Sequence, residues 1–223
     1  MSNSSLISYT KISPNKTSPR NHKIDTITIH CVVGQCSVET LGDIFYPKSR
    51  QASCNYGIGS DGRIGMYVEE KDRSWCSSNG SNDHRAITIE VASDTTHPYA
   101  VNSKAYKALI DLLVDICKRN GIKQLLWKGD KNLIGKVDKQ NMTVHRWFAN
   151  KSCPGDYLYN KHGEIAKEVN KRLAPVIKTK HEQAYECACD IEEKVGLDKA
   201  TINYLWKYKY ADDLFIKLWN AMK

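Results

Sequence analysis

The stretch Ile24-Asp-Thr-Ile-Thr-Ile-His-Cys-Val-Val33 decides the fold, because its β-branched and apolar residues predict a strand buried within a sheet. A second stretch of the same character, Ala86-Ile-Thr-Ile-Glu-Val-Ala92, predicts another strand. Successive side chains of a strand point to opposite faces, so we expect His30 and Cys31 on different sides of the sheet. Cys31 is therefore expected to be a poor partner for any metal ion that His30 binds.

Three segments with helical apolar spacing or helix-ending residues predict helices beside this sheet. They are Val38–Phe45, Asn102–Asn120 and Asp156–Leu173. Gly121 is expected to end the second helix and Pro175 the third. The chain is long enough for one sizeable domain with a small appendage. We therefore expect an α/β fold, with a mixed central β-sheet flanked by helices.

Loops, a hairpin and a short strand are expected between these elements. Cys54–Val68 predicts a hairpin with Asp61-Gly62 as its turn. A short strand is expected around Leu125–Trp127, followed by a polar loop. Residues 1–23 are polar and predict an irregular arm, and Trp75–Arg85 is rich in Ser and Asn and predicts a loop.

The chain divides, in this interpretation, into a main domain of residues 1–175 and a helical C-terminal region of residues 176–223. Two apolar stripes predict two or three helices there, one made of Ala184, Ala188, Ile191 and Val195, the other of Leu214, Phe215, Leu218, Trp219 and Met222. A helical unit of this size is marginal alone, so we expect it to dock on the main domain, to self-associate or to bind a ligand. The simpler alternative is that its aromatic residues only form its own core.

The charge of the chain is unevenly distributed. The net charge is +8, and from Val176 onward eight Lys balance eight Asp or Glu, so the excess lies in residues 1–175. A basic surface suits an anionic partner such as a nucleic acid or an acidic polymer. No helix carries a one-sided run of Lys and Arg interleaved with aromatic residues, which disfavours nucleic acid.

The sequence also bounds the compartment. No run is long and apolar enough for insertion into a membrane, and the N-terminal residues lack the apolar core of a signal peptide. We therefore expect the protein to stay in the cytoplasm. Its eight cysteines are irregularly spaced, and we interpret most of them as free, buried thiols.

The stretch Thr143-Val-His-Arg-Trp-Phe-Ala-Asn-Lys-Ser-Cys-Pro154 contains two soft metal ligands, His145 and Cys153, with Lys151 between them. Imidazole and thiolate are natural ligands of zinc, and His30 is the best third candidate. Three protein ligands leave the fourth position open, which distinguishes a catalytic zinc from a structural one. Taken singly, His30 is an ordinary core histidine and Lys151 a solvated surface charge.

These features together resemble the zinc-dependent N-acetylmuramoyl-L-alanine amidases, the family of phage endolysins, bacterial autolysins and peptidoglycan recognition proteins. The resemblance covers roughly residues 22–173. Ile-Thr-Ile-His30-Cys is similar to the first ligand segment of the family, Thr-Val-His145-Arg to the second, and Lys151-Ser-Cys153-Pro-Gly to the third. Ala86-Ile-Thr-Ile-Glu90 is similar to the strand that ends in the catalytic glutamate of one subgroup.

Two departures from the family pattern concern the surroundings of this site. Other members place a Tyr just before the hairpin, where this chain has Cys54, and we assign no catalytic role to nearby Tyr56. Members also often have Trp-His in the loop before the glutamate strand, where this chain has Trp75-Cys76. The contacts of that loop with a substrate are therefore not carried over.

The resemblance implies hydrolysis of the amide bond between N-acetylmuramic acid and L-alanine in bacterial peptidoglycan. Zn²⁺ bound by His30, His145 and Cys153 would activate a water by lowering its pKa to about 7. Glu90 would act as general base and Lys151 would stabilise the oxyanion. The implied role is that of a bacteriolytic phage enzyme, held in the host cytoplasm until it is released to the cell wall. Peptidoglycan is the expected partner, with anionic wall polymers as a further one.

Three other functions stay open at this point. The domain could bind peptidoglycan without cutting it, although the cysteine ligand and Glu90 favour an enzyme. It could be a cytoplasmic amidase that recycles muropeptides, which the basic main domain and the aromatic C-terminal region disfavour. Cys153 could instead be a thiol nucleophile with His145 as its base. Pro154 disfavours this last alternative, because it removes the backbone N–H that would follow the nucleophile.

Overall fold

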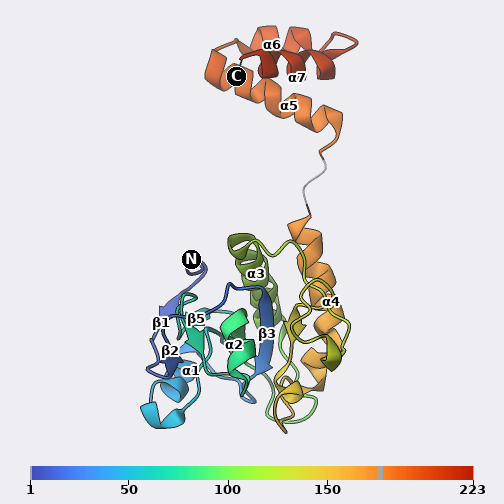
Figure 1. Cartoon of the computed structure of the whole chain (residues 1–223). Helices are drawn as coiled ribbons and strands as arrows, with labels where there is room; N and C mark the ends of the chain where they lie inside the picture. Colours follow the sequence, from blue (N-terminus) through green and yellow to red (C-terminus); the bar gives the residue numbers. More distant parts are fainter. Residues whose placement is uncertain (1, 175–177, 223) are drawn as a thin grey trace. The chain divides into compact units, whose positions relative to one another are not determined.

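The computed structural model describes residues 2–174 and 178–222, which form two compact units divided between Ala174 and Pro175 (Figure 1). The first unit contains a six-stranded sheet, and the described residues of the second form helices and no strand. Across the described residues, no helix combines the length and the apolar character that crossing a membrane requires.

The main sheet has the strand order β1-β5-β4-β7-β3-β8 and is mostly parallel. Its strands are β1 (Tyr9–Thr10), β5 (Ile64–Met66), β4 (Tyr56–Ile58), β7 (Ala86–Val91), β3 (Thr26–Cys31) and β8 (Met142–Thr143). Only the β4–β5 hairpin is antiparallel, and Gly62 in its turn has a positive φ of 87°. A second, two-stranded sheet pairs β2 (Lys16–Thr17) with β6 (Arg73–Ser74). The expected α/β class with a mixed central sheet is confirmed.

Helices pack on both faces of the main sheet. The helices of the first unit are α1 (Val38–Phe45), α2 (Gly80–Arg85), α3 (Ser103–Asn120) and α4 (Gly155–Leu173), with short 3-10 helices at η1 (Lys48–Arg50), η2 (Lys131–Leu133) and η3 (His145–Trp147). Helices α3 and α4 share one apolar core with Ile27, Ile29 and Ile89. A smaller core contains Leu41 and Phe45 of α1 together with Cys54 and Tyr67 from the hairpin segment. The predicted helices and the hairpin are therefore confirmed, whereas Pro175 lies outside the described residues.

The alternation of side chains along β3 separates the two faces chemically. Ile27 and Ile29 belong to the apolar core with α3 and α4. Thr28 and His30 have the opposite parity and are buried, so they face the side where α2 lies. Thr28 accordingly hydrogen-bonds to Asn82 of α2 and to Thr143 of β8. The sheet therefore presents a polar face at the point where β3 and β7 end.

Three sequence-based expectations were wrong at the level of local structure. The N-terminal arm is not irregular, because β1 pairs with β5 and β2 pairs with β6. Trp75–Arg85 is not only a loop, because Asn79 caps a short helix, α2, by accepting a hydrogen bond from the backbone N–H of Asn82. Both elements depend on partners that the local hydrophobic pattern does not show.

The third error is the strand expected around Leu125–Trp127, where none forms. The backbone N–H groups of Leu125 and Leu126 donate instead to the side-chain oxygens of Asn170 and Asn141, each at 2.7 Å. The strand beside β3 is β8, which follows this segment. Side-chain amides thus replace a strand partner in satisfying these backbone groups.

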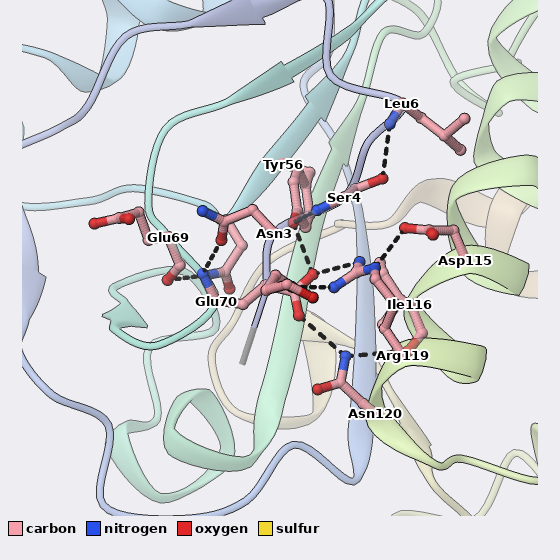
Figure 2. A network of polar contacts seen from close by, with 12 residues as sticks. Asn3, Ser4, Leu6, Tyr56, Glu69, Glu70, Asp115, Ile116, Arg119 and Asn120 are labelled. Carbon is pink, nitrogen blue, oxygen red and sulfur yellow. Dashed lines mark hydrogen bonds and ion pairs between the residues drawn. The ribbon is translucent and has the colours of Figure 1, made fainter.

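A buried polar network fastens the N-terminal residues to the rest of the first unit (Figure 2). The carboxylate of Glu70 is fully buried and accepts hydrogen bonds from Tyr56 (2.7 Å), Arg119 (2.6 Å) and Asn120 (3.0 Å). The backbone N–H of Ser4 donates to the Tyr56 hydroxyl at 3.0 Å. Burial and the neighbouring Glu70 carboxylate raise the pKa of Tyr56, so its hydroxyl stays protonated as a donor. Tyr56 therefore has a structural role, away from the polar face of the sheet.

The second unit is a small helical cluster with its own apolar core. Its elements are α5 (Lys180–Asp190), a π-helical turn η4 (Ile191–Val195), α6 (Lys199–Leu205) and α7 (Ala211–Met222). Thr179 and Glu182 form a reciprocal capping box at the start of α5. The core contains Ala184, Ala188, Ile191, Ile202, Ala211 and Phe215. Val195 and Met222, which belong to the predicted stripes, are about half exposed at 49% and 48%.

Candidate metal centre

His30 and Glu90 lie side by side near the ends of two neighbouring parallel strands. They are register partners in the β3–β7 pair, and the Nδ1 atom of His30 lies 4.0 Å from an Oε1 atom of Glu90. Strand β3 ends at Cys31, and two residues later Val33 has a positive φ of 56°. The parallel register therefore brings an imidazole and a carboxylate onto the same polar face.

His145 and Cys153 reach the same place from the segment between β8 and α4. His145 begins η3, and Cys153 lies two residues before α4. The Cys153 Sγ atom is 3.2 Å from His30 Nδ1, and the rings of His30 and His145 have centroids 5.1 Å apart. One ligand atom from each of His30, His145 and Cys153 lies within 4.8 Å of the others. The three side chains thus converge on one point from two distant parts of the sequence, the strand β3 and the segment between β8 and α4.

The two imidazoles are held neutral, as metal ligands must be. Burial, followed by the neighbouring His145, lowers the pKa of His30 to about 3. Burial and the Lys151 ammonium lower the pKa of His145. The thiol of Cys153 has the opposite tendency, since a hydrogen bond with Cys31, burial and the Glu90 carboxylate raise its pKa well above the usual value. A bound divalent cation would reverse this, because a coordinating thiol is deprotonated.

The carboxyl group of Glu90 titrates near neutral pH in the folded protein. Burial raises its pKa from 4.5 to about 7, although Arg50 and a hydrogen bond with Cys76 act in the other direction. Its Oε2 atom and the Nε2 atom of His30 are buried without a hydrogen-bond partner among the described residues. Two nitrogens and one sulfur beside an unpartnered carboxylate oxygen fit a zinc ion with an open coordination position.

A cleft of about 420 Å³ opens beside these groups. Its lining contains His145 and Lys151, together with the cationic side chains of Arg50 and Arg73 and the indole of Trp75. Lys151 is exposed at the edge of this cleft. The cleft is therefore basic and suits a substrate that carries carboxylates.

Several neighbours of the site were not identified from the sequence. Ser78 places its hydroxyl 3.0 Å from Nε2 of His145, and Arg50 and Arg73 line the cleft, although no motif singles these residues out. Cys31 also lies closer than expected: it is absent from the His30 cluster, but its side chain hydrogen-bonds with Cys153, which lowers the pKa of Cys31. Strand alternation predicted the separation of Cys31 from His30 and could not show that Cys153 comes near both.

Several solved structures share this fold. PlyL aligns with a TM-score of 0.54 and 15% identity, over 72% of this chain and 95% of that one. A mutant endolysin from Bacillus subtilis aligns with a TM-score of 0.53 and 16% identity, over 72% and 97% of the two chains. An AmpD derivative aligns with a TM-score of 0.52 and 17% identity, over 73% and 96%. No curated protein matches the chain in sequence.

The matching family model, together with the shared fold, defines the class of the first unit as an amidase domain. The family model described as N-acetylmuramoyl-L-alanine amidase matches residues 20–156, which include the strands β3 and β7 and all the candidate site residues. The chain belongs to this family and is an amidase that acts on peptidoglycan.

Proposed function

We propose that this chain hydrolyses the amide bond between N-acetylmuramic acid and L-alanine in peptidoglycan, with Zn²⁺ held by His30, His145 and Cys153. The observation that supports this most strongly is the convergence of these three ligand atoms beside Glu90, whose pKa is raised to about 7. Zinc bound there supplies a water of lowered pKa and a Lewis acid that polarises the scissile carbonyl.

Glu90 carries the proton transfers in this proposal. Its pKa of about 7 allows it to accept a proton from the attacking water and to donate it to the leaving nitrogen at neutral pH. The unpartnered Oε2 atom is the free acceptor for the first step. The hydrogen bond between the Cys76 thiol and Oε1, at 3.9 Å, leaves Oε2 available.

Lys151 is proposed to stabilise the oxyanion that forms at the carbonyl carbon. Its ammonium lies close enough to His145 to lower the pKa of that imidazole, and it lines the cleft. Lys151→Ala should lower kcat by about 10²–10³, whereas Lys151→Arg should retain part of the activity. Lys167→Ala, on the exposed surface of α4, is the matched control. Equal rates for the Lys151→Ala and Lys167→Ala proteins would exclude this role.

The reaction is tested on purified bacterial cell walls, with and without a chelator and with zinc restored afterwards. New N-terminal alanine should appear without new reducing sugar ends, and the chelator should abolish its appearance until zinc is added. A thiol enzyme using Cys153 would keep its activity after removal of the metal. A protein that binds walls and releases neither product would be a recognition module, and the roles of Glu90 and Lys151 would then be wrong.

We further propose that the protein serves as a phage lysis enzyme, made in the host cytoplasm and acting on the intact wall. The likeness of its fold to the Bacillus subtilis endolysin mutant supports this. The basic cleft suits an acidic, polymeric substrate. A muropeptide-recycling amidase is the alternative, and it predicts faster cleavage of soluble muropeptides than of whole walls at equal amide concentration.

The second unit is proposed to bind the cell wall. Four tyrosines are strongly exposed on it: Tyr185, Tyr204, Tyr208 and Tyr210. Tyr204 and Tyr208 line a cavity of about 570 Å³ together with Leu205, Lys207 and Leu214. Exposed rings beside a cation suit a surface that contacts sugars and anionic groups. Tyr204→Ala combined with Tyr208→Ala should weaken wall pull-down of the full chain, with Tyr185→Ala as control. A change in oligomeric state instead would assign this surface to self-association.

A further inference from the structure

Cys76 places a second thiol beside Glu90, in addition to the Cys153 thiol near His30. It lies in the loop between β6 and α2. Its Sγ atom is 3.9 Å from Oε1 of Glu90, and one ligand atom from each of His30, Cys76 and Glu90 lies within 4.8 Å of the others. This cluster shares His30 with the cluster of His145 and Cys153 and has no other member in common with it.

The loop that carries Cys76 is held in place by a buried carboxylate. Asp83 of α2 is 2% exposed and accepts hydrogen bonds from the backbone N–H groups of Cys76 at 3.0 Å and Ser77 at 3.2 Å. The side chain of Asn79 in turn caps α2. Hydrogen bonds within the fold therefore fix the backbone that places the Cys76 thiol near Glu90.

The spacing of the three groups matches the coordination of a soft divalent ion. A tetrahedral zinc ion places nitrogen, oxygen and sulfur ligands roughly 3.5 Å apart. His30 Nδ1 and Glu90 Oε1 are 4.0 Å apart, and Glu90 Oε1 and Cys76 Sγ are 3.9 Å apart, so small side-chain movements close the site. Imidazole, thiolate and carboxylate are all ligands that zinc, cobalt and cadmium accept.

We propose that His30, Cys76 and Glu90 form a second metal position, which takes a soft divalent cation and competes with the catalytic position for His30. The two positions cannot be occupied at the same time, because both need the same imidazole nitrogen. On binding at the second position, Cys76 releases its proton to solvent and Glu90 becomes a ligand. Glu90 is then unable to accept a proton from water, so an ion in this position holds the amidase inactive. The inference goes beyond the proposed function, because it concerns metal binding that needs no substrate.

In the test, all metal is removed from the full chain and cobalt(II) is then added. The thiolate-to-cobalt absorption band in the near ultraviolet reports whether a cysteine binds the cobalt. Cys153→Ser removes the only thiolate of the catalytic position, yet this variant should keep a cobalt–thiolate band from Cys76. Adding Cys76→Ser should abolish that band and weaken cobalt binding by more than about tenfold. Adding Cys36→Ser, a half-buried thiol outside both clusters, should leave it intact.

A second variant tests the carboxylate of the site. In the Cys153→Ser background, Glu90→Gln should lower the affinity for cobalt, because it removes a ligand while keeping the size of the side chain. In the Cys76→Ser background, where only the catalytic position remains, Glu90→Gln should leave the affinity nearly unchanged. Circular dichroism of each metal-free variant shows whether it is folded.

Two outcomes overturn the proposal. A Cys153→Ser protein that is folded and has no cobalt–thiolate band shows that Cys76 does not bind the metal. A band that survives in the double variant Cys153→Ser/Cys76→Ser shows that another cysteine supplies the thiolate. Cys31, the neighbour of Cys153, would be the first such cysteine to test. Neither readout depends on cleavage of the wall, so failure of the proposed amidase reaction would be recognised separately.

Discussion

Glu90 and His30 face each other across the β3–β7 pair as register partners, with Oε1 and Nδ1 4.0 Å apart. The parallel register alone sets this relationship, since the residues before them pair one to one from Thr26 and Ala86 onward. A shift of one residue would turn one of the two side chains to the apolar core. The sheet therefore couples the proposed base to a proposed metal ligand with little freedom.

Glu90→Gln is expected to abolish most of the amidase activity and to keep the metal. The amide has nearly the size of the carboxyl group but cannot accept the proton of water, so kcat should fall by about 10²–10⁴. Alanine release from walls measures the rate, and elemental analysis measures bound zinc. Glu168→Gln, an exposed change on α4, is the control. Full activity in the Glu90→Gln protein would show that another group takes the proton.

The metal-free protein is expected to lose stability as the pH rises through the titration of Glu90. The ordinary pKa of a glutamate side chain is 4.5, and the pKa of Glu90 in the folded protein is about 7. Between these values the folded state binds a proton that the unfolded chain has released, so stability falls with increasing pH. Relative to Glu90→Gln, the wild type should lose on the order of 3 kcal/mol of unfolding free energy across this window.

Urea unfolding with a chelator present, near pH 5 and near pH 8, measures this difference. The opposite contribution of His30, whose lowered pKa makes stability rise with pH below its ordinary value of 6.5, is present in both proteins and cancels to first order. A difference between the two proteins that does not change with pH would mean that Glu90 is ionised in the folded state throughout.

Zinc is expected to stabilise the wild-type protein, and the double change Cys153→Ser/Cys76→Ser should remove most of this gain, because it removes the thiol of both metal positions. A ligand at a hundred times its Kd adds about 2.7 kcal/mol to the free energy of unfolding. Loss of both thiolates leaves two imidazoles and a carboxylate, which bind zinc more weakly. Thermal unfolding with and without zinc measures the shift in Tm. Cys189→Ser, an exposed thiol of the second unit, should respond to zinc as the wild type does.

Glu70→Gln is expected to destabilise the first unit without affecting the metal site. The change leaves Arg119 without its fully buried carboxylate partner, although Asp115 still lies 2.8 Å from it. We expect a loss of about 3 kcal/mol in urea unfolding. Glu164→Gln, an exposed change on α4, should cost little. A Glu70→Gln protein as stable as the wild type would show that the network in Figure 2 contributes no net stability.

The local sequence pattern was sufficient to predict those helices and strands that bury a periodic apolar face. Helix α3 begins after Asn102, whose side chain caps it, and ends at Gly121, which has a positive φ of 68°. Both signals stand in the sequence beside the helix that they bound. Strands β3 and β7 were predicted for a similar reason, because a strand buried on both faces reads as a continuous β-branched run.

Elements held by distant partners could not be predicted in this way. Strand β1 has only two residues and exists because β5 offers its backbone groups. The expected strand around Leu125–Trp127 does not form, because the side chains of Asn141 and Asn170 accept the hydrogen bonds of its backbone N–H groups. In each case the decisive hydrogen bonds join residues far apart in the chain.

The sequence by itself determined the α/β class and, through the family motifs, the identity of His30, Glu90, His145, Lys151 and Cys153 as candidates. Only the tertiary structure decided that Cys31 touches Cys153, that Cys76 faces Glu90, and that Arg50 and Arg73 line the cleft. The physical reason is that strand and helix periodicity is a local property of the chain. Burial, pKa and ligand geometry instead depend on which loops meet at the ends of β3 and β7.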